Sequence, residues 1–499
     1  MPRKETYMRR ALALLLPVLM MTAFLTVFHP ASAVSAETDP GKQTEALLTF
    51  SRELNEMVGE YAPKAEKSDD PYGTARLIVK CGAAPDLSDA VAYVYGCGRY
   101  VIQYSSPNEA RKAAERLRLL DTVEYAVPDA IVSVSELSAV NAAPMQEPNV
   151  DSFHSWGYGA DYIDAYAFNE WLLEQAGGDV NALPEIIVAV IDTGLETGLP
   201  YFSGRTVPGY DFADNDNDVT GGFFHGTHVA GTVVDGTLPN VRIMPLKCTD
   251  DYGSAITSNI INCMQYAYLH GAQVANVSIG GYYPETFDAY TSVINAGSDA
   301  GTVYCVASGN DGTNVGYCYP ACIERAFTVA AHDRNFNMWS GSNTGNSVDI
   351  TAPGVDIVSA MPNGSFQAQT GTSMAAPHAA AACAMLKSLD PDLSADEVMD
   401  MLRSAAVDHG LSGGGAGILS MTALIGGTEP PPTPPPQILP GDVNCDGIVD
   451  SVDALMALRC AMGIVQLEGD ALIAGDIDGN GLIESIDALI ILRRAMGLA

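Results

Sequence analysis

The chain has 499 residues, of which 47% are hydrophobic and 8% aromatic, and this length suits roughly two to four folded domains. It carries 60 acidic residues against 25 basic ones, for a formal net charge of −35. That balance argues against a nucleic-acid partner, because binding a phosphate backbone requires clustered lysine and arginine. It fits a soluble secreted protein, or one that gathers cations.

The first 33 residues have the pattern of a secretory signal peptide. Basic residues precede an apolar run over 11–28, and Ala31-Ser32-Ala33 forms a small-residue cleavage site. An uncleaved membrane anchor is the alternative, because the run approaches the length that spans a bilayer. Pro17, Pro30 and the cleavage site favour removal, so we expect an extracellular protein.

A small α+β unit is predicted next, with its folded core at 75–136. Residues 76–80 and 100–104 read as strands, Pro107 begins a helix that runs to 120, and 130–134 reads as a closing strand. Residues 137–152 have the composition of an exposed connection.

The main domain, at 151–425, alternates apolar runs with helical stretches, which predicts an α/β fold with a parallel sheet covered by helices on both faces. The expected strands are 186–191, 241–246, 274–279, 303–307 and 327–331. The expected helices are 226–234, 255–270, 287–300, 373–389 and 395–406.

Ten cysteines are few for a chain of this length, so disulfides are not its framework. Cys318 and Cys322, four residues apart in a loop, are the best candidates for a disulfide. Cys305 and Cys383 lie in apolar segments and are expected to be buried thiols.

A proline-rich tract at 426–440 follows, and predicts a semi-rigid spacer, with a proline-recognition ligand as the alternative. Beyond it, residues 441–499 hold an internal repeat of 34 residues, which carries Asp442 onto Asp476.

Three segments of the main domain hold the groups that nucleophilic catalysis needs. Ser373 follows a glycine at a helix start, Asp192 ends an apolar strand, and His225 begins a helix. A serine hydroxyl requires an imidazole that takes its proton and a carboxylate that orients the imidazole. Each segment alone also suits an ordinary turn or helix cap.

Together Asp192-Thr193-Gly194, the run His225-Gly226-Thr227-His228 and Gly371-Thr372-Ser373-Met374 resemble the subtilisin-like serine proteases, in that family's order. The resemblance implies that Asp192 orients His225, that His225 is the general base and that Ser373 is the nucleophile. His228 is expected to pack or bond locally.

The resemblance also implies an oxyanion donor and a substrate-binding edge. Asn310 matches the family's oxyanion asparagine, which acts with the backbone N–H of Ser373. The substrate-binding residues implied are Ser278, Ile279, Gly280, Gly281, Ser308 and Gly309.

Two departures from the family pattern stand out. The segment between Gly231 and Val241 is too short for a calcium loop found in many members, so a calcium ion in this domain is uncertain. The acidic turn at 214–218 is an alternative calcium site, although a solvated turn is the more expected reading. Phe223 and Phe224, directly before His225, are bulkier than expected.

The unit at 75–136 resembles the family's inhibitory propeptide, which makes 34–150 a propeptide region with its cut in 137–155. An unrelated N-terminal domain is the alternative.

The C-terminal repeat has calcium-loop spacing, with oxygen side chains at positions 1, 3, 5, 9 and 12 and glycine at 6. The expected ligands are Asp442, Asn444, Asp446, Ile448, Asp450 and Asp453, then Asp476, Asp478, Asn480, Leu482, Glu484 and Asp487. Two such loops after a proline-rich linker resemble the type I dockerin, a small all-α module. This resemblance implies two bound calcium ions and a cohesin partner, read by Ser451, Val452, Ser485 and Ile486. A plain calcium-stabilised tail is the alternative.

These inferences predict a secreted endopeptidase tethered to a cellulosome-like assembly, whose other enzymes would act in polysaccharide catabolism. The competing hypothesis is a catalytically inactive component with the same fold.

Overall fold

The computed structural model describes residues 70–82, 91–96, 98–134 and 158–425, and, between 441 and 495, chiefly 451–462, 470–477 and 482–495. The predicted signal peptide, the connection at 137–152 and the linker at 426–440 lie outside these residues.

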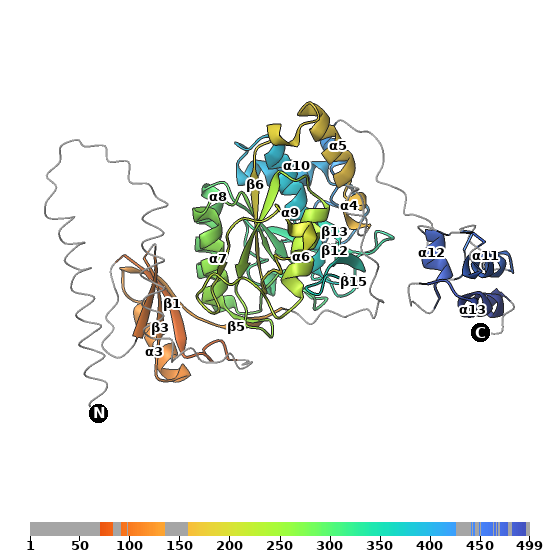
Figure 1. Ribbon diagram of the computed structural model, residues 1–499. Coiled ribbons are helices and arrows are strands. Elements are labelled where there is room, and N and C mark those ends of the chain that lie inside the picture. Colours follow the sequence, from red (N-terminus) through yellow and green to blue (C-terminus); the bar gives the residue numbers. More distant parts are fainter. Residues whose placement is uncertain are drawn as a thin grey trace. The chain divides into compact units, whose positions relative to one another are not determined.

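A seven-stranded parallel sheet forms the centre of the main domain (Figure 1), in the order β13-β12-β11-β10-β6-β8-β7. Every pair of neighbouring strands in this sheet is parallel. In chain order the strands are β6 (Ile186–Asp192), β7 (Tyr210–Asp211), β8 (Val241–Lys247), β10 (Val274–Val277), β11 (Val303–Ala307), β12 (Phe327–His332) and β13 (Ile350–Pro353).

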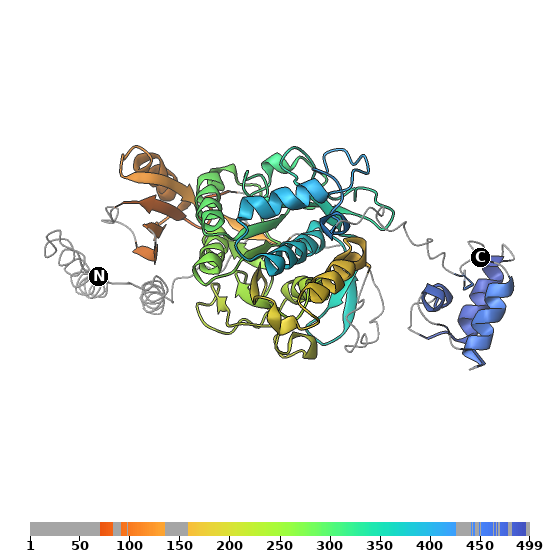
Figure 2. The same cartoon turned by 90° about the horizontal axis from the view of Figure 1, so that it is seen from above.

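Helices cover both faces of this sheet, as Figures 1 and 2 show. One face packs on α5 (Ala165–Gln175), α6 (His225–Asp235), α9 (Thr372–Leu389) and α10 (Ala395–Ala405). The other packs on α7 (Thr257–Leu269) and α8 (Phe287–Asp299). Side chains along β6 alternate between the two resulting cores, with Val188 and Val190 in one and Ala189 and Ile191 in the other. The predicted α/β class is confirmed.

All five strands and five helices expected in the main domain are present. The predicted helix at 255–270 begins two residues later, because Ser254–Ile256 form strand β9. Several elements without long apolar runs were not predicted from the sequence pattern. They are β7, β13, the helix α4 (Gly159–Tyr162), α5, and the hairpin of β14 (Ile357–Ala360) and β15 (Phe366–Gln369).

The N-terminal unit is a four-stranded antiparallel sheet in the order β2-β3-β1-β4, with one helix. Its elements are β1 (Arg76–Cys81), β2 (Val91–Gly96), β3 (Arg99–Gln103), α3 (Pro107–Leu117) and β4 (Val123–Pro128). The prediction that residues 130–134 close this sheet as a strand is wrong. Its counterpart, β5 (Ile131–Ser133), pairs antiparallel with β9 of the main domain.

The C-terminal part contains α11 (Ser451–Ala461), α12 (Asp470–Gly475) and α13 (Ser485–Ala495). Helices α11 and α13, which occupy equivalent places in the repeat, contact each other. The buried apolar cluster is small and consists of Val443, Ala454, Ala457, Ile483, Ala488 and Ile491.

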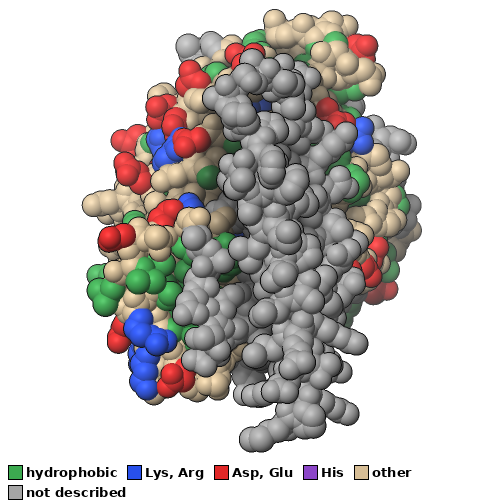
Figure 3. Space-filling model, turned by 90° about the vertical axis from the view of Figure 1, so that its left-hand side faces the viewer, with side chains coloured by type: hydrophobic (Ala, Val, Ile, Leu, Met, Phe, Trp, Pro, Cys, Tyr) green, Lys and Arg blue, Asp and Glu red, His purple; other side chains and the backbone are tan. Residues whose placement is uncertain are grey.

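Within the described part of the chain, no helix is both long enough and apolar enough to cross a membrane. On the face shown in Figure 3, acidic side chains are scattered over the described residues, in keeping with the strongly negative net charge.

Candidate active site

Asp192 is the last residue of β6, a strand held between β8 and β10. Its side chain is fully buried, and its Oδ1 accepts a hydrogen bond of 2.7 Å from the backbone N–H of Thr193. The same oxygen lies 2.7 Å from Nδ1 of His225. The sheet therefore aims a carboxylate at the first residue of α6.

His225 is fully buried at the start of α6. Since its Nδ1 faces a carboxylate oxygen, Nδ1 carries the proton and Nε2 is left as an acceptor. Nε2 is buried and has no hydrogen-bond partner among the described residues. A buried unpaired acceptor is costly, and at this position it is poised to receive a proton.

Ser373 is the second residue of α9, the helix that packs against α6. Its hydroxyl donates to the backbone carbonyl of Ser278 at 3.3 Å, and the Ser278 hydroxyl donates back to the carbonyl of Ser373 at 3.1 Å. The hydroxyl of Ser373 is thus tied to the segment after β10, and not to His225, in this structure. In enzymes without substrate such catalytic bonds are often long, and they tighten when substrate binds.

A pocket opens beside Ser373, and Asn310 is one of its walls. Oδ1 of Asn310 accepts from both the backbone N–H and the Oγ1 of Thr372, each at 2.8 Å. The amide nitrogen is therefore left for a ligand. The pocket is lined by Ser278, Ile279, Gly280, Tyr282, Ala307, Gly309, Asn310, Cys318, Thr372 and Ser373.

Ser308 departs from the prediction that it binds substrate. It is fully buried and donates its hydroxyl to the carbonyl of Asn343 at 2.9 Å, so it supports the wall from behind. Gly281 does not line the pocket either, and instead pairs through its backbone with Tyr319. Because Gly309 has a φ of 104° and a Cβ there would lie 2.3 Å from Nδ2 of Asn343, only glycine fits this wall.

Sequence reasoning missed Tyr282 and Cys318 in this pocket. The Tyr282 hydroxyl donates to Asp311 and accepts from Nδ2 of Asn343, which holds the ring in place. Its position directly after Gly280-Gly281 was the available signal. Cys318 and Cys322 are free thiols, so the predicted disulfide is wrong. Burial raises the pKa of Cys318 to about 12.

Three other histidines are buried and neutral. His228 is packed in the core as expected, but its Nε2 bonds to the carbonyls of Ile357 and Gln367, which are distant in the sequence and not local, and burial lowers its pKa to about 3. Burial likewise lowers the pKa of His332 and of His378 to about 4. These side chains are packing groups and not proton carriers at neutral pH.

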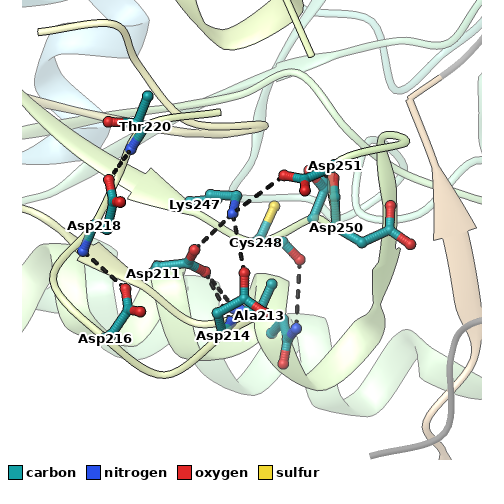
Figure 4. A network of polar contacts seen from close by, with 12 residues as sticks. Asp211, Ala213, Asp214, Asp216, Asp218, Thr220, Lys247, Cys248, Asp250 and Asp251 are labelled. Atoms are coloured by element: carbon teal, nitrogen blue, oxygen red, sulfur yellow. Dashed lines mark hydrogen bonds and ion pairs between the residues drawn. The ribbon is translucent and has the colours of Figure 1, made fainter. Parts of the chain in front are cut away.

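The acidic turn at 214–218 is organised by a lysine (Figure 4). Nζ of Lys247, on β8, lies 2.7 Å from Oδ2 of Asp211 and 3.3 Å from Oδ2 of Asp214. The carboxylates of Asp216 and Asp218 accept backbone N–H bonds within the turn. These carboxylates are paired with the lysine ammonium group or with backbone N–H groups of the turn. The geometry therefore favours a solvated turn over a calcium site.

In the C-terminal repeat, the described residues show how position 12 of each loop is held. Asp453 and Asp487 are fully buried. Asp453 Oδ1 accepts from the N–H of Asn444 at 3.0 Å, and Asp487 accepts from the N–H groups of Ile477 and Glu484 at 3.0 and 2.8 Å. Asp476 and Leu482 are also described, and the other predicted ligands, Asp442, Asp446, Ile448, Asp450, Asp478 and Asn480, lie outside the described residues.

The predicted partner-reading positions lie on the surface. Val452 and Ile486 are 49% and 45% exposed, next to the exposed Ser451 and Ser485. The sequence reading missed Leu455 and Leu489, one helical turn further on, which are 54% and 51% exposed. Their signal was their equivalence in the repeat.

Comparison with known proteins supports both parts of this description. Residues 184–422 match the subtilase family, and residues 440–494 match the dockerin type I domain. The chain is 32% identical over 327 residues to the thermophilic serine proteinase of Bacillus sp. (strain AK1), covering 60% of this chain and 79% of that protein. It is 34% identical over 250 residues to thermitase of Thermoactinomyces vulgaris, covering 48% of this chain and 85% of thermitase.

A solved structure extends the likeness in fold. The crystal structure of fervidolysin from Fervidobacterium pennivorans, described as a keratinolytic enzyme related to subtilisin, matches 74% of this chain and 63% of its own, with a TM-score of 0.58 and 24% identity. By its sequence match to more than three quarters of each of these two proteases, the chain belongs to the subtilase family of serine proteases, and it carries a type I dockerin domain at its C-terminal end.

Proposed function

We propose that the protein is a secreted serine endopeptidase that is anchored by its dockerin to a cohesin-bearing scaffold. The observation that carries the catalytic part is the buried contact of 2.7 Å between Asp192 and His225. It leaves Nε2 of His225 with no hydrogen-bond partner among the described residues, and His225 begins the helix that packs against the helix of Ser373.

In the proposed reaction, Nε2 of His225 takes the proton of Ser373 as Oγ attacks the carbonyl carbon of the scissile peptide bond. The negative oxygen formed is held by the amide nitrogen of Asn310 and the backbone N–H of Ser373. His225 then gives its proton to the leaving amine, and an acyl-enzyme remains. A water molecule, deprotonated by His225, attacks the acyl group, and the released Ser373 recovers its proton. Asp192 stabilises the imidazolium in both steps.

The N-terminal unit is proposed to be the propeptide, because it caps a helix of the catalytic domain and pairs with an edge of the pocket beside Ser373. Asp129 is fully buried and accepts from the backbone N–H and the hydroxyl of Ser258, each at 2.8 Å, in the first turn of α7. An acid at this place satisfies an unpaired N–H and faces the positive end of the helix dipole. Beyond it, Ser133 bridges to Gly280, a residue of the pocket beside Ser373. Such a strand excludes substrate until it is cut away.

The dockerin is proposed to bind two calcium ions through the oxygen ligands of its two loops. Buried carboxylates such as Asp453 and Asp487 are costly unless a charge or strong hydrogen bonds compensate them, and calcium supplies that charge. The paired, exposed apolar residues of α11 and α13 then present the surface for a cohesin.

Replacement of the nucleophile tests the catalytic proposal. Ser373→Ala should lower kcat for peptide hydrolysis by about 10⁶-fold, the size found when a triad nucleophile is removed, and should leave the secreted precursor uncut. Ser203→Ala, at an exposed serine, is the matched control and should behave as the wild type. Unchanged turnover in Ser373→Ala would rule the proposal out. If the wild type fails to react with a serine-directed phosphonate, it is the inactive component.

A further inference from the structure

Strand β5 lies beside the pocket of Ser373 and shows how an extended peptide can pair with the catalytic domain. Strand β5 pairs with β9, with Val132 opposite Ala255, and its other edge bridges from Ser133 to Gly280. Val132 and Val134 are buried, at 6% and 8% exposure, while Ile131 and Ser133 are half-buried. The alternate side chains that face the catalytic domain are therefore the two valines.

The side chain of Val134 lies where Gly253 meets Phe223. The N–H of Val134 donates to the carbonyl of Gly253 at 2.9 Å. A Cβ placed on Gly253 would lie 3.7 Å from Cδ1 of Phe223 and 3.7 Å from Cβ of Val134. The space beside Gly253 is thus bordered by both the ring and the valine, and Phe223 packs on the apolar cluster that contains Val134.

Phe223 is held firmly beside the catalytic histidine. Its carbonyl accepts from Oγ1 of Thr193 at 3.1 Å, and the same Oγ1 accepts from the N–H of Gly226 at 2.9 Å. The ring stacks on Phe224 with centroids 5.0 Å apart. Phe223 is thus tied through Thr193 to the residues that follow Asp192 and His225 in the sequence. Because its backbone is held in this way, little reorganisation of Phe223 is needed when a peptide binds.

We propose that Phe223, with Gly253, selects an aliphatic side chain in the substrate at the position of Val134. The bridge between Ser133 and Gly280 is antiparallel, so a substrate in the same register places the second residue after the position of Ser133 opposite Ser278. The carbonyl of Ser278 contacts the hydroxyl of Ser373, so the substrate residue opposite Ser278 carries the scissile carbonyl. The selected residue is the one directly before it. Valine or isoleucine fills the site and favours the extended chain, glycine leaves it empty, and aspartate would be desolvated against an aromatic ring. This inference rests on the proposed peptidase function.

The test measures kcat/KM of the activated full-length protein for quenched peptides that differ only in the residue before the one with the scissile carbonyl. Valine should exceed glycine or aspartate by about tenfold or more, as expected for one apolar side chain in a preformed pocket. Phe223→Ala should abolish the preference, because KM for the valine peptide should rise toward the value for the glycine peptide. Phe223→Leu should restore part of it.

Tyr252→Ala is the matched control, because this aromatic residue, directly before Gly253, is 87% exposed. It should keep the valine preference. Hydrolysis with equal kcat/KM for all peptides, or a preference that survives Phe223→Ala, would overturn the inference while leaving the peptidase function intact. Absence of hydrolysis of every peptide by the wild type would instead count against the peptidase function itself.

Discussion

The catalytic domain and the C-terminal repeat both bury aspartates, and they compensate them differently. Asp211 lies 2.7 Å from the ammonium group of Lys247, so the catalytic domain supplies its own cation. Asp453 and Asp487 accept backbone N–H bonds in loops with calcium spacing. Two extensive cores flank the sheet of the catalytic domain, the second with side chains of the N-terminal unit, whereas the described residues of the repeat form one small cluster. Because a small core stabilises a domain less, we expect the repeat to depend on bound metal more than the catalytic domain does.

Removal of calcium gives the largest expected difference between the two regions. Calcium at 100 times its Kd stabilises a domain by about 2.7 kcal/mol for each site, a large share of the stability of so small a core. We expect EGTA to unfold the repeat and release a bound cohesin, with peptide hydrolysis retained. Calorimetry of the full chain, with hydrolysis measured in parallel, checks this expectation.

The double variant Asp453→Asn/Asp487→Asn is the control for chelation, because it should weaken calcium binding in both loops without changing a residue of the catalytic domain. A C-terminal transition that ignores EGTA would contradict the metal dependence. Loss of hydrolysis in EGTA, with the variant fully active, would place a calcium ion in the catalytic domain instead.

The internal cation of the catalytic domain gives the next largest effect. Lys247→Met removes the ammonium and leaves Asp211 buried, and burial already raises the pKa of this carboxyl. We expect a loss of about 3–5 kcal/mol in the free energy of unfolding, measured by urea denaturation of the Ser373→Ala protein. Asp299→Asn, which breaks a more exposed ion pair to Arg325, should cost less than about 1 kcal/mol. Equal costs would refute the comparison.

The smallest effect per residue is a pH dependence of the catalytic domain. His228, His332 and His378 have pKa values lowered to about 3, 4 and 4, whereas an unfolded histidine titrates near 6.5. The unfolded state therefore binds more protons below pH 6.5, and stability falls as the pH drops toward 4. Each histidine should contribute about 2 kcal/mol to this loss at pH 5. A free energy of unfolding that is equal at pH 7.5 and 5 would show that these rings are not buried and neutral.

Local pattern was enough for the elements that carry chemistry. β6 and β11 are continuous apolar runs, and α9 is a run of small residues after Gly371, so their positions follow from neighbours in sequence. The sequence predicted only part of the exposed apolar surface of the repeat. Leu455 and Leu489 have the pattern of core residues, and only the helix packing shows that they are exposed.

By itself, the sequence determined that a carboxylate, an imidazole and a hydroxyl stand at element ends, and that two calcium-type loops repeat after a linker. Only the tertiary structure decided that β5 pairs with β9 and not with the N-terminal sheet, that Ser308 is buried, and that Phe223 packs on the cluster that contains Val134. The reason is physical. Element formation depends on side chains a few residues apart, whereas strand partners and pocket walls depend on which distant surfaces exclude water together.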